Sequence, residues 1–98
     1  MKAVQLAQER FAYAEDAFVE IVVWRVPAPL RGSTHSYKCR LAFVVSGACV
    51  LRYDNEAGKG DHRHLYGREY DCTFRSIEQV LVDFNAEVRS LNDEDSDT

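Results

Sequence analysis

The chain has 98 residues, of which 46% are hydrophobic and 29% are charged, a composition that predicts one globular domain and excludes a disordered chain. Its longest apolar run lies near Phe18–Val26 and is interrupted by Glu20 and Arg25, which excludes a membrane-spanning helix of about 20 apolar residues. The net charge of −4 is carried by four acids near the C-terminal end, so binding of nucleic acid would require a local basic patch.

The first half of the chain is predicted to form antiparallel strands. Weak alternation of apolar and polar residues predicts a strand over Ala3–Tyr13, and the β-branched and aromatic run Phe18–Trp24 predicts a second one. The two prolines that follow end regular pairing and introduce an exposed loop. His35 lies in this loop, where we expect an isolated surface histidine.

Two longer strands are predicted on either side of a turn at Gly47. They cover Tyr37–Ser46 and Ala48–Asn55, and their alternation separates an apolar face from a charged face. Two short strands are then predicted over His62–Tyr66 and Tyr70–Phe74, joined by a turn at Gly67. Together these elements indicate a meander of about five to six antiparallel strands.

The last predicted element is a helix over about Ile77–Leu91. Ser76 and Gln79 have the spacing of a capping box at its start. Its apolar residues follow helical periodicity and form one stripe: Ile77, Val80, Leu81, Phe84, Val88 and Leu91. We therefore predict an α+β fold in residues 1–91, with the helix packed on one face of the sheet, and an acidic disordered tail in residues 92–98.

Titratable side chains are concentrated between Tyr53 and His64, around the loop Gly58-Lys59-Gly60. His62 and His64 are one residue apart, so on a strand both imidazoles project to one face. Three interpretations remain open: acid–base cleavage of a phosphodiester, a metal site completed by a nearby carboxylate, or solvated surface histidines. The glycine turn likewise either presents backbone N–H groups and a lysine to phosphate or is only a soluble turn, and it lacks the P-loop pattern.

A basic patch is predicted on the charged face of the middle strands. Lys38, Arg40 and Arg52 share this face by parity, and pairing of the two strands about Gly47 would bring Arg40 close to Arg52. Such a patch can hold a phosphate backbone. The alternative is an ordinary solvent-facing surface whose charges are balanced by two acids, Asp54 and Glu20.

The three cysteines, Cys39, Cys49 and Cys72, include no C-x-x-C pair and none of them adjoins a histidine. We therefore expect reduced cysteines packed as small apolar residues in a cytoplasmic protein, and no nucleophilic catalysis. The start of the chain lacks the pattern of a secretion signal. No cofactor is expected.

The strands Phe18–Pro27 and Tyr37–Val45, and above all the stretch Arg52–His64, resemble the TumE-type family of small prokaryotic proteins. The segments Thr73–Ser76 and Asp83-Phe84 also fit this family. The resemblance implies a toxin of a two-gene toxin–antitoxin module, paired with a helix-turn-helix antitoxin. The candidate positions that it carries over are Arg52, Tyr53, Asp54, Lys59, Asp61, His62 and His64.

By analogy with other small toxins, our preferred hypothesis is a ribonuclease that requires no metal. His62 and His64 would be acid and base, Lys59 and Arg52 would stabilise charge, and Asp61 or Asp54 would orient an imidazole. Three residues would bind the substrate: Arg40, Lys38 and Tyr53. The alternative is a module that binds protein or nucleic acid without catalysis, and an exposed edge at Ala3–Tyr13 would allow pairing with the antitoxin or with a second copy.

Overall fold

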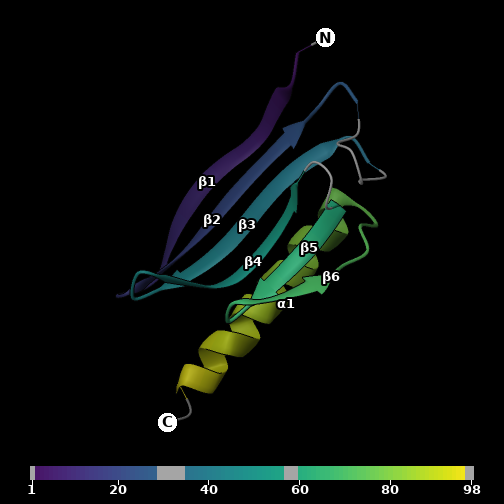
Figure 1. The fold of residues 1–98 in the computed structure, drawn as a ribbon. Helices are drawn as coiled ribbons and strands as arrows, with labels where there is room; N and C mark the ends of the chain where they lie inside the picture. Colours follow the sequence, from purple (N-terminus) through teal and green to yellow (C-terminus); the bar gives the residue numbers. More distant parts are fainter. Residues whose placement is uncertain (1, 29–34, 57–59, 97–98) are drawn as a thin grey trace.

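The computed structural model describes residues 2–28, 35–56 and 60–96. These residues form one sheet in which every strand is antiparallel to the next along the chain, and one helix follows the sheet (Figure 1). The elements in order are β1 (Val4–Ala14), β2 (Ala17–Arg25), β3 (Tyr37–Val45), β4 (Ala48–Glu56), β5 (Gly60–Leu65), β6 (Arg68–Asp71) and α1 (Ile77–Ser96). The predicted α+β meander with a C-terminal helix is confirmed.

Two of the hairpins have turns that the sequence specifies directly. Ser46-Gly47 joins β3 to β4, and Tyr66-Gly67 joins β5 to β6. In both turns the two central residues have positive φ, between 48° and 81°, as a type I′ turn requires. Glycine adopts this backbone conformation without steric cost, and the twist of such turns matches that of the flanking strands.

Helix α1 begins at the predicted cap. The backbone N–H of Gln79 donates to Ser76 Oγ at 3.0 Å, which is half of a capping box. The Gln79 side chain does not complete the box, because its Nε2 donates instead to Asp83 at 2.8 Å. The helix continues to Ser96, five residues beyond the predicted end at Leu91, while the disorder predicted for the tail stays a prediction.

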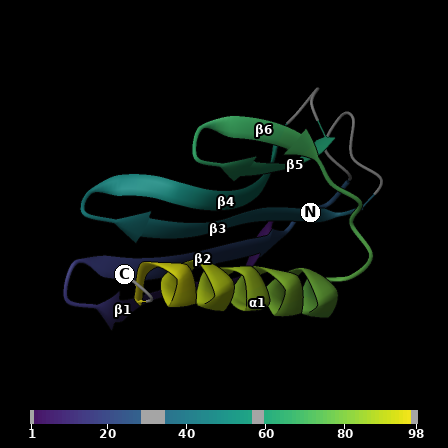
Figure 2. The same ribbon diagram turned by 90° about the horizontal axis from the view of Figure 1, so that it is seen from below.

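The core lies between the helix and one face of the sheet. Phe84, Val88 and Leu91 of α1 pack with the inward residues of β2, β3 and β4, among which Leu41, Phe43 and Leu51 are almost completely buried. All six residues of the predicted helix stripe belong to this core or pack against it. Figure 2 shows α1 along one side of the sheet, so that the other side carries no helix. We call this side the open face.

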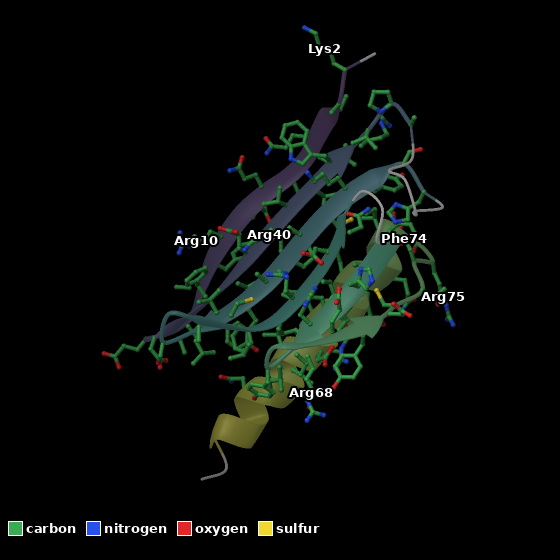
Figure 3. The ribbon with its side chains drawn as sticks, in the orientation of Figure 1. Lys2, Arg10, Arg40, Arg68, Phe74 and Arg75 are labelled. Atoms are coloured by element: carbon green, nitrogen blue, oxygen red, sulfur yellow. The ribbon has the colours of Figure 1, made fainter. Side chains whose placement is uncertain are left out.

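The strand boundaries agree with the predictions to within a few residues, with β6 as the largest difference. It spans Arg68–Asp71 rather than Tyr70–Phe74, because pairing with β5 begins immediately after the tight turn at Gly67. Phe74 therefore lies in the segment between β6 and α1, where Figure 3 shows it.

Candidate active site

The register of the sheet brings the two histidines of the H-x-H triplet into a cluster of charged residues on the open face. Residues directly opposite one another in antiparallel strands share a face. One cross-strand row runs from Arg40 through Asp54 and His62 to Asp71. The neighbouring row contains Ala42, Arg52, His64 and Glu69. The prediction that both imidazoles project from one face of a strand therefore agrees with the structure.

His62 lies in a carboxylate environment on this face. Its Nε2 is 3.4 Å from Asp71 Oδ1, and its Nδ1 is 3.7 Å from Glu69 Oε1. These separations are longer than a hydrogen bond, so the ring is attracted by both acids but is not locked to either of them. Only 12% of the His62 side chain is exposed, whereas Asp71 is fully exposed.

His64 contacts the carboxylate that lies deepest in the cluster. Its Nε2 is 3.5 Å from Asp54 Oδ1 and 3.9 Å from Glu69 Oε1. Asp54 also forms an ion pair with Arg52, whose Nε lies 3.0 Å from Asp54 Oδ2. Within the described part of the chain, Arg52 Nε nevertheless makes no hydrogen bond of good geometry. Asp54 therefore links one histidine to one arginine.

The three basic residues predicted to share one face do so, but acids balance two of them. Arg40 Nη1 donates to Glu20 Oε1 at 2.5 Å, and Arg52 pairs with Asp54. These are the two acids that the alternative interpretation named. Arg40 projects over the middle strands of the face turned toward the reader in Figure 3, with α1 behind the sheet. Lys38 is exposed on the same face of β3.

Three of the predicted site residues lie elsewhere or outside the described residues. Tyr53 lies on the helix side of β4, where its hydroxyl donates to Glu87 Oε1 at 2.7 Å. Asp61 also lies away from the histidine cluster, and Lys59 lies outside the described residues. The roles predicted for these three residues stay predictions.

His35 is not the isolated surface residue that the sequence suggests, and this expectation is wrong. Its side chain is 7% exposed and stacks on Phe74 with ring centroids 3.6 Å apart. Its Nδ1 accepts the backbone N–H of Tyr37 at 3.1 Å, so the neutral ring carries its proton on Nε2 and donates it to Asp61 Oδ1 at 2.7 Å. The pair ties the beginning of β3 to β5 and to the segment before α1.

A second polar group, which we call the Glu87 network, joins the helix to the sheet. Arg63 lies between the two histidines in sequence and therefore faces the helix, where its Nε and a terminal guanidinium nitrogen bind the two carboxylate oxygens of Glu87. Tyr53 donates to the same carboxylate. Burial raises the pKa of Glu87, but the hydrogen bonds from Arg63 and Tyr53 outweigh it and hold that pKa below its ordinary value.

The Glu87 network was not found from the sequence, although a signal for it exists. By helical periodicity, Glu87 lies on the same side of α1 as Phe84, Val88 and Leu91. An acid therefore occupies the side of the helix that faces the sheet. An acid at such a position needs a hydrogen-bonding or charged partner. Only strand residues whose side chains point toward the helix can supply this partner. Arg63 has the required parity.

A comparison with protein-family models identifies the chain's relatives. The model described as "Toxin TumE" matches residues 2–92, almost the whole chain. The chain belongs to the TumE toxin family. No curated protein and no solved structure matches it. Membership in this toxin family implies an antitoxin partner.

Other features of this TumE-family chain limit the chemistry of its site. Burial raises the pKa of Cys39 to about 12 and that of Cys72 to about 11, so at neutral pH both thiols stay protonated and are poor nucleophiles. Among the described residues, no group of three or more histidine, cysteine or acidic side chains is placed to hold a metal ion. None of the described helices is long and apolar enough to cross a membrane.

Proposed function

We propose that this TumE-family toxin slows growth by cleaving RNA in the cytoplasm, with His62 and His64 as general acid and base. The observation that carries the proposal is that both imidazoles share the open face of the sheet, each within 4 Å of a carboxylate. Residues two apart on a strand are separated by about 6.6 Å along the strand, so a phosphate fits between the two rings. Carboxylates beside both rings would orient them for proton transfer.

The proposed reaction is transfer of a phosphodiester to the neighbouring 2′-oxygen. One neutral imidazole removes the 2′-hydroxyl proton, and the 2′-oxygen forms a bond to phosphorus. The bond from phosphorus to the 5′-oxygen breaks, and the other histidine, as imidazolium, donates its proton to the departing oxygen. The products are a 2′,3′-cyclic phosphate and a 5′-hydroxyl, so atoms and charge balance without an added reactant.

Arg52 supplies the positive charge that this step requires. Charge accumulates on the non-bridging phosphate oxygens in the transition state, and a fixed cation there stabilises it. Arg52 is directly opposite His64, is 31% exposed and makes no hydrogen bond of good geometry through Nε to the described residues. Lys59 is proposed to stabilise the same charge, and this role rests on the sequence alone.

The proposed partner is a helix-turn-helix antitoxin, and the outer edge of β1 is a surface that fits a partner. β1 is the first strand of the sheet, so one of its edges is unpaired in the described structure. It also exposes large apolar side chains: Val4, Leu6, Phe11 and Tyr13. Exposed strand edges with apolar residues accept a further strand, from the antitoxin or from a second copy of the chain.

A second candidate function is supported by the charge pairs of the open face. Because Arg40 and Arg52 already contact acids, the face is also suited to docking a partner without catalysis. In that case growth inhibition would come from sequestration of the partner.

Turnover distinguishes the two functions. We expect purified protein, treated with a chelator, to degrade RNA present in large molar excess, because the proposed step uses only protein groups. The measurement is the amount of fragmented RNA per mole of protein over time on a denaturing gel. Protection or shifting of RNA at stoichiometric ratios without fragments would support the binding module, and loss of cleavage in the chelator would support a metal-dependent hydrolase.

A further inference from the structure

The open face contains a groove that the proposed reaction does not use. Its volume is about 360 Å³, within the range of small-molecule sites. It lies over β2 and β3, beside the beginning of β1, and its lining consists of Ala3, Val22, Trp24, Val26, Lys38, Cys39 and Arg40. We call it the Trp24 groove.

The Trp24 groove combines an aromatic surface with positive charge. Trp24 is directly opposite Lys38, and Val22 is directly opposite Arg40. Among the described residues, the lining contains two cations and no acid, although Glu20 pairs with Arg40 from outside the groove. A groove with this lining favours a ligand that has a flat apolar part and a negative part.

A nucleotide has this chemistry. Successive bases of a single strand stack on aromatic side chains, while lysine and arginine contact the phosphates, and this mode of binding tolerates any base. We propose that the Trp24 groove is a base-stacking subsite for single-stranded RNA, an inference that rests on the ribonuclease function proposed above. Trp24 stacks one base, and Lys38 and Arg40 contact the adjoining phosphates.

The groove is linked by register to the proposed catalytic cluster. Arg40 borders the groove and is in register with Asp54 and His62 on the next two strands. Trp24 and His62 are separated by three strand spacings across the sheet and by two residues along the strand direction. The standard dimensions of a sheet make this distance about 16 Å. A strand of a few nucleotides spans this distance. The base on Trp24 would therefore position the phosphate between the histidines.

The test uses the full chain and a short single-stranded oligodeoxynucleotide, which lacks the 2′-hydroxyl and cannot undergo the proposed cleavage. Trp24 is the only tryptophan of the chain, so its fluorescence reports directly on the groove. We expect saturable quenching on titration. Anisotropy of a labelled oligonucleotide should show affinity weakened roughly tenfold or more for Trp24→Ala, and largely kept for Trp24→Phe.

Two further variants define the contact. Phe18→Ala removes an aromatic residue from the same face of β2, where it lies under Arg10 and outside the groove, and should leave the affinity unchanged. Lys38→Gln should reduce the slope of log affinity against log salt by about 0.7, the value expected for one phosphate contact in a single strand.

Unchanged fluorescence, together with equal affinity of Trp24→Ala and the wild type, would overturn the inference. If RNA turnover were normal in that case, only the subsite would be wrong. Binding that depends on Trp24 without any RNA turnover would instead remove the enzymatic function and support the groove. Quenching by purified antitoxin but not by the oligonucleotide would also overturn the inference and assign the groove to protein.

Discussion

Replacement of His62 and His64 together by glutamine is expected to reduce RNA turnover by at least about a hundredfold and to abolish growth arrest. Glutamine keeps a polar side chain on the open face but cannot exchange a proton near neutral pH. Each single variant should lose most of the activity, because the proposed step needs both a base and an acid. The measurements are turnover of purified protein and colony survival after induced expression.

Folding of the variants must be verified in the same experiment. Thermal unfolding of the double variant should remain cooperative and close to that of the wild type, since neither imidazole makes a hydrogen bond within the described residues. Arg68→Gln is a matched control, because Arg68 is exposed on the adjoining strand and does not belong to the cluster. Arrest that persists in a folded double variant would remove the histidines from the mechanism.

Glu87→Gln is expected to lower the free energy of unfolding by about 1.5–3 kcal/mol, the range for hydrogen bonds to charged groups. The substitution keeps the size of the side chain but removes the charge that holds Arg63, leaving that guanidinium only 26% exposed and without its carboxylate. Denaturant unfolding measures the loss. Asp83→Asn on the preceding turn of α1 is the control, since Asp83 is exposed.

The effect of Glu87 should depend on pH in one direction. Its pKa is lower in the folded chain than the ordinary value of 4.5, so its ionised form stabilises the fold fully above pH about 4.5. This contribution is lost as the pH falls through the lowered pKa. The difference in unfolding free energy between wild type and Glu87→Gln should therefore be constant at neutral pH and shrink under acid conditions; a difference that grows on acidification would contradict the assignment.

The fold was largely predictable because its signals are local. Period-two alternation defines β3 and β4, glycines specify the turns at Gly47 and Gly67, and the helix stripe has a cap at Ser76. The end of α1 was less predictable. No glycine or proline terminates the helix after Leu91, so the acidic segment offers no local stop signal.

The candidate site was predictable only to the extent that side chains alternate between the two faces of a strand. Alternation alone placed His62 and His64 on one face of their strand, and placed Arg40 and Arg52 on one face of the middle strands. That both pairs share the open face follows from the register of the sheet. Parity could not give the partners of these residues, because partners depend on the register between strands. Asp54 was one of two acids considered for orienting an imidazole, and only the register puts it beside His64 while Asp61 contacts His35.

The remaining contacts depend on how distant segments meet. His35 is 26 residues from Asp61, and Arg63 is 24 residues from Glu87, so neither pair follows from a local pattern. In the Glu87 network the acid on the apolar side of α1 was a usable signal. For His35 the sequence contains no comparable signal, because its surroundings form only when the segment before α1 places Phe74 against the ring.

The chemical ends of the RNA fragments test the central claim most directly. Fragments produced by purified protein can be identified by mass spectrometry. Acid–base transfer to the 2′-oxygen predicts 2′,3′-cyclic phosphate, or the 3′-phosphate formed from it, together with 5′-hydroxyl ends. Fragments with 3′-hydroxyl and 5′-phosphate ends would contradict the account, because they require water rather than the 2′-hydroxyl as the nucleophile.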